Sequence, residues 1–330
     1  MRAAAILGLG SSIRDLKPFQ NHHPEITWSL GLPAYGTSDI VLIFGGDGTV
    51  HRHLAALVKL ALPVLVVPRG SGNDFARALG IESVQDAVRA WQRFVAGKST
   101  TRSIDLGSIE PIPASTAPGR NQHVAGHIAS KHYFCCVAGA GLDAAVTRLA
   151  NRLPPWLRAH GGYALSLPVG LACFDPCHVT VLQESAADPN AFTERYSQPA
   201  LLAAVANTPT YGGGMRIAPR AALDDGLLDV CIVGKLPKFK LLALFPTVYR
   251  GRHLGIKRVD YFQVKGVRIQ TPRPIDVYAD GEYVCQTPVQ VSVVPHALSV
   301  IAPQTVGSTD GTGENNGRLN LKLTIPLVLH

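Results

Sequence analysis

Charge, long apolar runs and metal-ligating motifs are all scarce in this sequence of 330 residues. Charged side chains make up only 16% of the residues, against about 25% in an average soluble protein, so neutral groups must cover much of the surface. No uninterrupted apolar stretch reaches the roughly 18 residues that a membrane-spanning helix needs. We therefore expect any membrane contact to be peripheral.

The six cysteines form no metal-ligand array. Cys135 and Cys136 are adjacent in an apolar run, whereas Cys173 and Cys177 flank a Phe-Asp-Pro turn and are the one pair spaced for a disulfide or a metal. We interpret all six as reduced, mostly buried thiols, the usual state of cysteine in the cytoplasm. The predicted location is therefore cytoplasmic.

The residues that are abundant exclude several protein classes. Hydrophobic residues make up 46% of the chain, which excludes disorder over most of its length. The 32 glycines and 24 prolines predict many tight turns and argue against a helical bundle. A net charge of +8 suits anionic partners such as phosphates or an acidic membrane surface. Nucleic acid is not expected as a partner, because no recognised reader motif is present.

The first 105 residues alternate between strand and helix patterns, which predicts a three-layer α/β domain built on a parallel sheet. The expected strands are Ala3–Leu7, Glu25–Trp28, Ile40–Phe44 and Val64–Val67. One expected helix begins near Thr49, and two more cover Phe75–Leu79 and Val84–Val95.

Residues 106–303 predict a second domain, a mostly antiparallel β-sandwich. Its expected helices are Leu142–Leu153 and Lys238–Tyr249. Residues 304–330 are predicted to be a disordered tail. The expected strands are Tyr133–Val137, His178–Leu182, Leu201–Ala206, Leu228–Val233, Gly266–Thr271, Ile275–Tyr278, Val289–Val294 and Leu298–Ile301.

The loop Gly45-Gly46-Asp47-Gly48-Thr49 joins a predicted strand to a predicted helix. Its glycines let the backbone approach a ligand closely, and the helix adds its positive end, so a phosphate is favoured there. A carboxylate in this loop would repel phosphate unless it held a metal or a proton. Asp47 is therefore predicted to be a Mg²⁺-linked group or a base for an attacking hydroxyl. The alternative is a tight turn in which Asp47 caps a helix.

A second glycine loop, Gly70-Ser71-Gly72-Asn73-Asp74, follows the next strand and should emerge at the same edge of the sheet. Ligands of open α/β sheets bind outside the carboxyl ends of the strands. Neither loop matches the P-loop or the dinucleotide fingerprint.

Six blocks, taken in order, resemble the diacylglycerol kinase catalytic domain of bacterial soluble lipid kinases, a family related to sphingosine kinases and more distantly to NAD kinases. The resemblance implies a lipid kinase that uses ATP and Mg²⁺, in which residues 1–105 bind the nucleotide and residues 106–303 bind the lipid or other substrate. The blocks are the first glycine loop, Pro68–Arg77, Tyr211–Met215, Ala218-Pro219, Asp224–Leu227 and Asp280-Gly281-Glu282.

Carried over by position, the resemblance implies a role in ATP binding for both glycine loops and for Thr27. Glu282 would be the proton acceptor, with Asp280 and Asp47 beside it as catalytic groups. In the Ala222–Leu227 turn, the Asp225 side chain and the carbonyls of Ala222 and Leu227 would hold Mg²⁺. The ATP-binding positions are Thr27, Gly45, Gly46, Asp47, Gly48, Thr49, Val50, His51, Gly70, Ser71 and Asn73.

Both acidic turns also have a plain structural interpretation. Asp-Asp-Gly and Asp-Gly between alternating strands are common hairpin turns. The stretch Leu9–Ser12 also lacks the Asn-Pro that the family has after its first strand, and Gly31, Pro33 and Gly36 would break a helix before residue 40.

The region from 235 to 258 combines basic residues with Phe239, Phe245 and Tyr249. This mixture is typical of a solvated basic face or of a helix that docks on a membrane. His51 and His53 cannot share a helix face, so they do not predict a joint metal site.

The leading hypothesis is a kinase that transfers the γ-phosphoryl group of ATP to a glycerolipid such as diacylglycerol at a membrane surface. A second hypothesis keeps the fold but takes a sphingoid base, another glycerolipid or NAD as the acceptor. A third is a non-catalytic module that binds nucleotide or lipid. The sequence leaves the oligomeric state open, a homodimer included.

Overall fold

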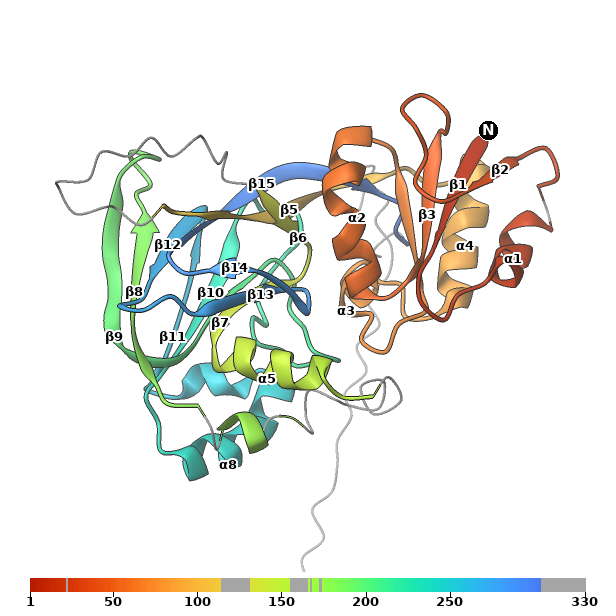
Figure 1. The fold of residues 1–330 in the computed structure, drawn as a ribbon. Coiled ribbons are helices and arrows are strands. Elements are labelled where there is room, and N and C mark those ends of the chain that lie inside the picture. Colours follow the sequence, from red (N-terminus) through yellow and green to blue (C-terminus); the bar gives the residue numbers. More distant parts are fainter. Residues whose placement is uncertain (22, 114–130, 155–165, 167, 172–173, 304–330) are drawn as a thin grey trace, which may run out of the picture.

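The computed structural model describes residues 1–303, apart from residues 22, 114–130, 155–165, 167 and 172–173. Two domains lie side by side, and long strands connect them (Figure 1). Fifteen described strands form one hydrogen-bonded network that runs through both domains. The predicted fold class is confirmed, with parallel strands in the first domain and antiparallel strands in the second.

The sheet of the first domain is parallel and has the strand order β4-β3-β1-β2. Every residue of β3 and β4 is buried, as expected for parallel strands that are covered on both faces. The strands are β1 (Arg2–Leu7), β2 (Thr27–Leu30), β3 (Ile40–Gly45) and β4 (Val64–Pro68).

The helices of the first domain cover this sheet, with α2 on one side of the strands and α4 on the other (Figure 1). Ser83 and Asp86 form a capping box at the start of α4, which fixes where that helix begins. Residues 31–39 make turns and no helix, as the glycines and proline there predict. The helical segments are η1 (Ile13–Leu16), α1 (Lys17–Gln20), α2 (Asp47–Leu60), α3 (Asp74–Ala78) and α4 (Val84–Val95).

The second domain folds its antiparallel strands around a separate apolar core that includes Val181, Val230 and Val267. Its helical segments are α5 (Leu142–Asn151), α8 (Lys238–Tyr249) and η2 (Arg252–Gly255). Its strands are β5 (Arg102–Pro111), β6 (His132–Phe134), β7 (Val137–Gly141), β8 (Cys177–Glu184), β9 (Phe192–Ala206), β10 (Leu228–Gly234), β11 (Val259–Val264), β12 (Gly266–Gln270), β13 (Asp276–Ala279), β14 (Glu282–Gln286) and β15 (Val289–Val300).

Strands β5 and β15 tie the two domains together. They pair with each other along most of their length, and Val300 at the end of β15 pairs in parallel with Val64 of β4. The domain boundary predicted at residue 105 therefore falls inside β5. The chain also returns to the first sheet at its last described strand.

Three predicted strands differ from the structure. Tyr133–Val137 is divided into β6 and β7, because the N–H groups of residues 135–137 bond to the Asp280 carboxylate and not to a neighbouring strand. The two strands predicted over residues 289–301 are one strand, β15, with a bulge where the His296 N–H donates to Asp105. Strands β5, β11 and β14 are additions that the sequence did not predict.

The predicted tail, residues 304–330, and Cys173 lie outside the described residues. The other five cysteines are free thiols. Within the part of the chain that the structure describes, no helix is long and apolar enough to cross a membrane.

Candidate active site at the domain junction

The two glycine loops touch each other at the carboxyl ends of β3 and β4. The Arg69 N–H donates to the Gly45 carbonyl at 3.0 Å. A methyl group placed on Gly70 would come within 2.4 Å of the Gly46 Cα, so both positions need glycine for this close approach. The prediction that the loops lie side by side is confirmed.

Asp47 joins the first loop to the start of α3. Its carboxylate accepts hydrogen bonds from the backbone N–H groups of Asp74 and Phe75, both at 3.0 Å. Burial and the nearby Asp74 carboxylate raise the pKa of Asp47 to about 6, although the two N–H bonds oppose that rise. Asp47 therefore caps a helix, which was the alternative interpretation of its sequence position. The helix that it caps is α3, and not α2, in which Asp47 itself lies.

Asn73 holds the second loop in shape. Its side-chain amide accepts from the Gly70 N–H at 2.8 Å and donates to the Gly70 carbonyl at 2.7 Å. Ser71, at the tip of this loop, is exposed. The hydroxyl of Ser71 is thus available to a ligand, whereas Asn73 serves the loop itself.

Asp74 links the two domains. Its buried carboxylate accepts from the N–H groups of Gly213 and Gly214, at 2.8 and 3.0 Å, and pairs with Arg77 at 2.6 Å. The glycine run of the second domain is thereby held against the second loop of the first domain.

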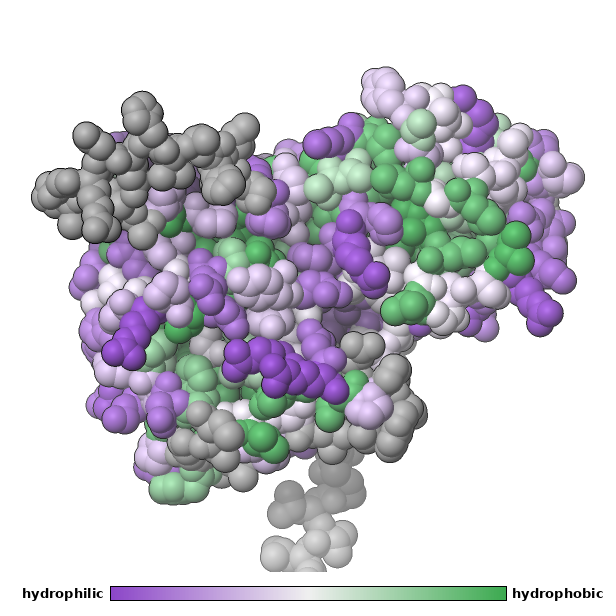
Figure 2. All heavy atoms as spheres, viewed as in Figure 1, coloured by the Kyte–Doolittle hydropathy of each residue, from purple (hydrophilic) through white to green (hydrophobic). Residues whose placement is uncertain are grey.

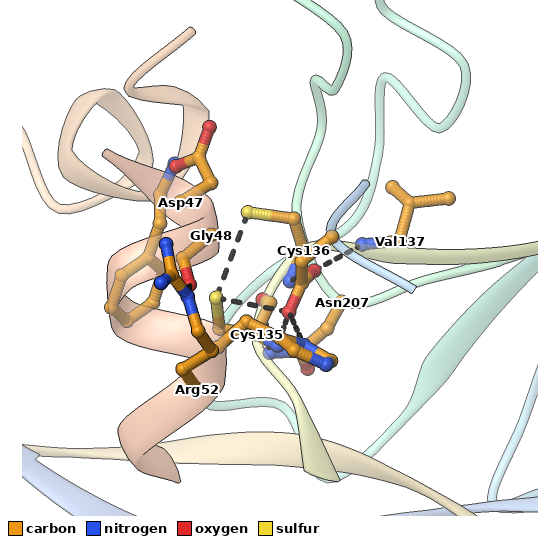
Figure 3. A network of polar contacts seen from close by, with 10 residues as sticks. Asp47, Gly48, Arg52, Cys135, Cys136, Val137 and Asn207 are labelled. Carbon is orange, nitrogen blue, oxygen red and sulfur yellow. Dashed lines mark hydrogen bonds and ion pairs between the residues drawn. The ribbon is translucent and has the colours of Figure 1, made fainter. Parts of the chain in front are cut away.

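Asp280 lies at the turn between β13 and β14, with φ of +50°. Its side chain is fully buried and accepts from the N–H groups of Cys135, Cys136 and Val137 at 2.8 to 3.2 Å. The same carboxylate is 3.0 Å from Nδ1 of His51 on α2. Figure 3 shows this network beside the start of α2. These contacts engage both oxygens of the Asp280 carboxylate.

His51 faces two carboxylates from the second domain. Burial lowers its pKa, but the hydrogen bond to Asp280 and the charges of Asp280 and Glu282 outweigh that effect, so the pKa of His51 is raised. A protonated imidazole is therefore favoured at this position.

Glu282 is the acidic residue that faces the first loop most directly. A methyl group placed on Gly48 would lie 3.0 Å from its Oε1 atom. No hydrogen bond or ion pair joins the Glu282 side chain to another described residue, so its carboxylate is available to a ligand. The expectation that the acidic turn folds over onto the glycine loop is confirmed.

A polar cleft of about 360 Å³ opens between α2 and the edges of β6 and β14. Figure 2 shows hydrophilic side chains gathered where the two domains meet on this face. Its lining residues are His51, Arg52, Leu54, Ala55, Lys131, His132, Tyr133, Glu282 and Tyr283.

Three predicted ATP contacts are not supported by position. Thr27 begins β2 and pairs with Arg2, at the amino ends of the parallel strands, whereas the glycine loops lie at the carboxyl ends. This position does not support the prediction for Thr27. The Val50 side chain is buried in the core and its N–H donates to the Gly46 carbonyl. Thr49 also donates its N–H to Gly46, and its side chain fills space beside Gly45.

The Ala222–Leu227 turn lies apart from these loops. Asp224 forms an ion pair with Arg102 of β5. Arg102 is paired with Val300 of β15, and Val300 is paired with Val64, the first residue of β4. The Asp225 carboxylate accepts from the Leu227 N–H at 3.0 Å and is exposed. One carboxylate with backbone carbonyls suits a hard cation, and the turn is tied to β5 by the Gly226 N–H, which donates to Asp105.

An apolar cavity of about 70 Å³ lies beneath α8. It reaches Tyr211 and Met215, which flank the glycines that bind Asp74. The cavity thus approaches the junction from the second domain. Its lining also includes Leu142, Leu201, Leu202, Ile217, Val233, Leu236, Leu241, Phe245, Val248, His253, Ile256 and Val259.

Comparison with known proteins agrees with this arrangement. Residues 22–109 match the model of the diacylglycerol kinase catalytic domain, and residues 136–302 match that of the YegS C-terminal NAD kinase beta sandwich-like domain. The chain is also 32% identical over 271 residues to a diacylglycerol kinase of Mycobacterium tuberculosis, covering 82% of this chain and 79% of that one. The chain belongs to the diacylglycerol kinase family. It is a lipid kinase.

Other members of this family match a similar or larger share of the chain at lower identity. A diacylglycerol kinase of Bacillus subtilis is 26% identical over 81% of this chain and 78% of its own. The crystal structure of a diacylglycerol kinase from Bacillus anthracis superposes with a TM-score of 0.60 at 18% identity, covering 92% of this chain and 97% of that one. That structural match establishes the shared fold.

Sequence reasoning missed three groups of the lipid kinase site. The sequence indicated Asp74 only as the last residue of the second glycine loop, and Cys135 and Cys136 only as buried thiols. The run of three glycines at 212–214 was a usable signal, because consecutive glycines expose N–H groups to an acidic partner. Nothing in the sequence identified that partner as Asp74.

Proposed function

We propose that this lipid kinase transfers the γ-phosphoryl group of ATP to a hydroxyl of a glycerolipid such as diacylglycerol, in a Mg²⁺-dependent reaction. The observation that carries the proposal is the position of the Glu282 carboxylate beside Gly48, at the start of α2. A helix start with glycine neighbours favours a phosphate, and an unoccupied carboxylate next to it suits the removal of a proton from an acceptor hydroxyl.

Each residue of the site has a separate task in this proposal. The backbone of the Gly45–Gly48 loop binds the phosphates, and Glu282 accepts the proton of the attacking hydroxyl. His51, positioned by Asp280, places positive charge where negative charge develops. Asp47 holds the first loop against the start of α3, and Asp74 holds the two domains together.

Of the four described acidic side chains near the glycine loops, one carboxylate remains available to a cation at the ATP phosphates. Mg²⁺ bound with ATP offsets the charge of the transferring phosphoryl group. Asp47, Asp74 and Asp280 each accept two or more N–H bonds, whereas Glu282 has no such partner among the described residues. Glu282 would therefore be the carboxylate nearest to such a cation, and one of its two oxygens would have to stay free of the metal to accept the proton. A cation held by Asp225 would instead stabilise its own turn.

The apolar cavity favours a lipid acceptor over NAD. Its wall is almost entirely aliphatic and aromatic, which suits an acyl chain and offers little to a dinucleotide. Its approach to Met215 brings a bound chain toward the domain junction.

The exposed face of α8 supports peripheral contact with an anionic membrane. Phe239 is 72% exposed and Tyr249 is 40% exposed, and the neighbouring Lys240 and Arg250 are exposed as well. Aromatic and basic side chains on one helix are typical of interfacial binding. Docking there would bring α8 and the cavity beneath it to the lipid surface.

A kinase assay with labelled ATP, Mg²⁺ and mixed lipid vesicles tests the reaction. We expect lipid-dependent phosphate incorporation, and a fall in kcat of about 10²- to 10⁴-fold for Glu282→Gln, because a general base is lost. Glu194→Gln changes an exposed glutamate of β9 and serves as the control. Lack of lipid-dependent incorporation, with Glu282→Gln equal to wild type, would refute the proposal.

Vesicle sedimentation tests the membrane contact separately. Phe239→Ala should reduce binding to vesicles rich in anionic lipid. Tyr35→Ala removes a side chain that is 85% exposed on the first domain and should leave binding unchanged. Equal binding by both variants would place the membrane contact elsewhere.

A further inference from the structure

Two adjacent thiols lie beneath the acidic turn and have no role in the proposed reaction. Cys135 and Cys136 form the bend between β6 and β7, and both are buried. Figure 3 shows their sulfur atoms directed toward the start of α2, at Asp47 and Gly48. The Asp280 carboxylate lies against the same bend.

Two of the three spacings between these donor atoms match those of a tetrahedral metal site. The two Sγ atoms are 3.9 Å apart, and Cys135 Sγ is 3.4 Å from Asp280 Oδ2. All three donor atoms lie within 4.8 Å of one another. Around Zn²⁺, with bonds of about 2.3 Å to sulfur and about 2.0 Å to oxygen, tetrahedral angles put two sulfurs about 3.8 Å apart and sulfur and oxygen about 3.5 Å apart.

We propose that Cys135, Cys136 and Asp280 form a binding site for a single thiophilic divalent cation such as Zn²⁺ or Cd²⁺. Both thiols lose their protons on binding, so one cation replaces two protons and is held by two thiolates and one carboxylate. Three protein ligands leave a fourth position for water or another small donor.

The site is partly preorganised. Three backbone N–H groups of the bend already hold the Asp280 carboxylate, and the Cys135 thiol already points a hydrogen bond at Oδ2. The cation would take the place of that thiol proton. Sulfur ligands select soft or borderline cations, whereas Mg²⁺ prefers oxygen. Excess Mg²⁺ should therefore not compete for this site.

Binding would also affect the active site. Oδ2 of Asp280 is the atom nearest to His51 Nδ1, at 3.0 Å. A cation on Oδ2 would weaken that hydrogen bond and add positive charge behind the start of α2. The proposal concerns binding, however, and stands whether or not the protein phosphorylates lipids.

A Cd²⁺ titration of the reduced full-length protein in excess Mg²⁺ tests the site. We expect one strong site per chain, seen as thiolate-to-cadmium charge-transfer absorption in the ultraviolet, with two protons released per cation. The double variant Cys135→Ser/Cys136→Ser should lose this absorption or bind at least about 10-fold more weakly. The control Cys173→Ser/Cys177→Ser removes the other closely spaced pair and should behave as wild type.

A single variant covers the case in which the double variant does not fold. Cys136→Ala removes one sulfur atom but keeps the backbone N–H that Asp280 accepts. It should release one proton per Cd²⁺ and bind at least about 10-fold more weakly. Unchanged absorption and proton release in Cys136→Ala, or their loss in the Cys173/Cys177 control, would overturn the proposal.

Discussion

Asp47→Asn should change how the stability of the protein depends on pH. Folding raises the pKa of Asp47 from 3.8 to about 6, mainly because the carboxylate is buried and lies near Asp74. Between these values the unfolded chain has lost the proton while the folded chain keeps it. The stability of the wild type must therefore fall as pH rises through this window.

The size of the effect follows from the shift. About 2 pKa units correspond to about 3 kcal/mol, and about 2 kcal/mol of this falls between about pH 4.5 and about pH 7. Asparagine cannot ionise. The free energy of unfolding of Asp47→Asn, relative to wild type, should therefore rise by about 2 kcal/mol over that range, whatever the constant cost of its altered hydrogen bonds.

Urea unfolding followed by tryptophan fluorescence measures this difference, because Trp28 and Trp91 belong to the core of the first domain. Asp86→Asn is a control of opposite sign. Hydrogen bonds from Ser83 lower the pKa of Asp86, so its removal should cost more stability at neutral than at acid pH. A difference between Asp47→Asn and wild type that does not vary with pH would refute the reasoning.

Three further predictions concern the junction. Gly70→Ala forces the two glycine loops apart and should lower the free energy of unfolding by about 1–3 kcal/mol, whereas Gly255→Ala, where a methyl group meets no atom within 4 Å, should be nearly neutral in the same urea titration. Asp280→Asn turns an amide toward backbone N–H donors and should lower the free energy of unfolding by about 1–3 kcal/mol. An NMR titration of this variant should also show a lower pKa for His51. An unchanged pKa would contradict the ion pair between His51 and Asp280. Asp74→Asn weakens the link between the domains, so calorimetry should show two separated unfolding transitions; one unchanged transition would argue against the link.

Local patterns predicted the regular elements well. The helical patterns at Val84–Val95 and Lys238–Tyr249 correspond to α4 and α8, with the predicted bounds. The continuous apolar runs of β3 and β4 also needed no information from elsewhere in the chain. Each of these signals depends on residues that are close in sequence.

The remaining features depend on partners far away in sequence. The bend at Cys135-Cys136 exists because Asp280, 145 residues later, takes the N–H groups that a strand would have used. The resemblance assigned Thr27 to the nucleotide by its residue type alone, whereas the register of β1 and β2 puts it at the beginning of its strand. Single-sequence patterns contain neither long-range hydrogen bonds nor strand register.

The pairing of β15 with β4 has a consequence for synthesis of the protein on the ribosome. The first domain emerges early, yet β4 obtains the neighbour at Val64 only after residue 300 has been made. Until then, one edge of its parallel sheet has unpaired backbone groups that could pair with another chain. Nascent chains that stall before this point would be the ones most in need of a chaperone.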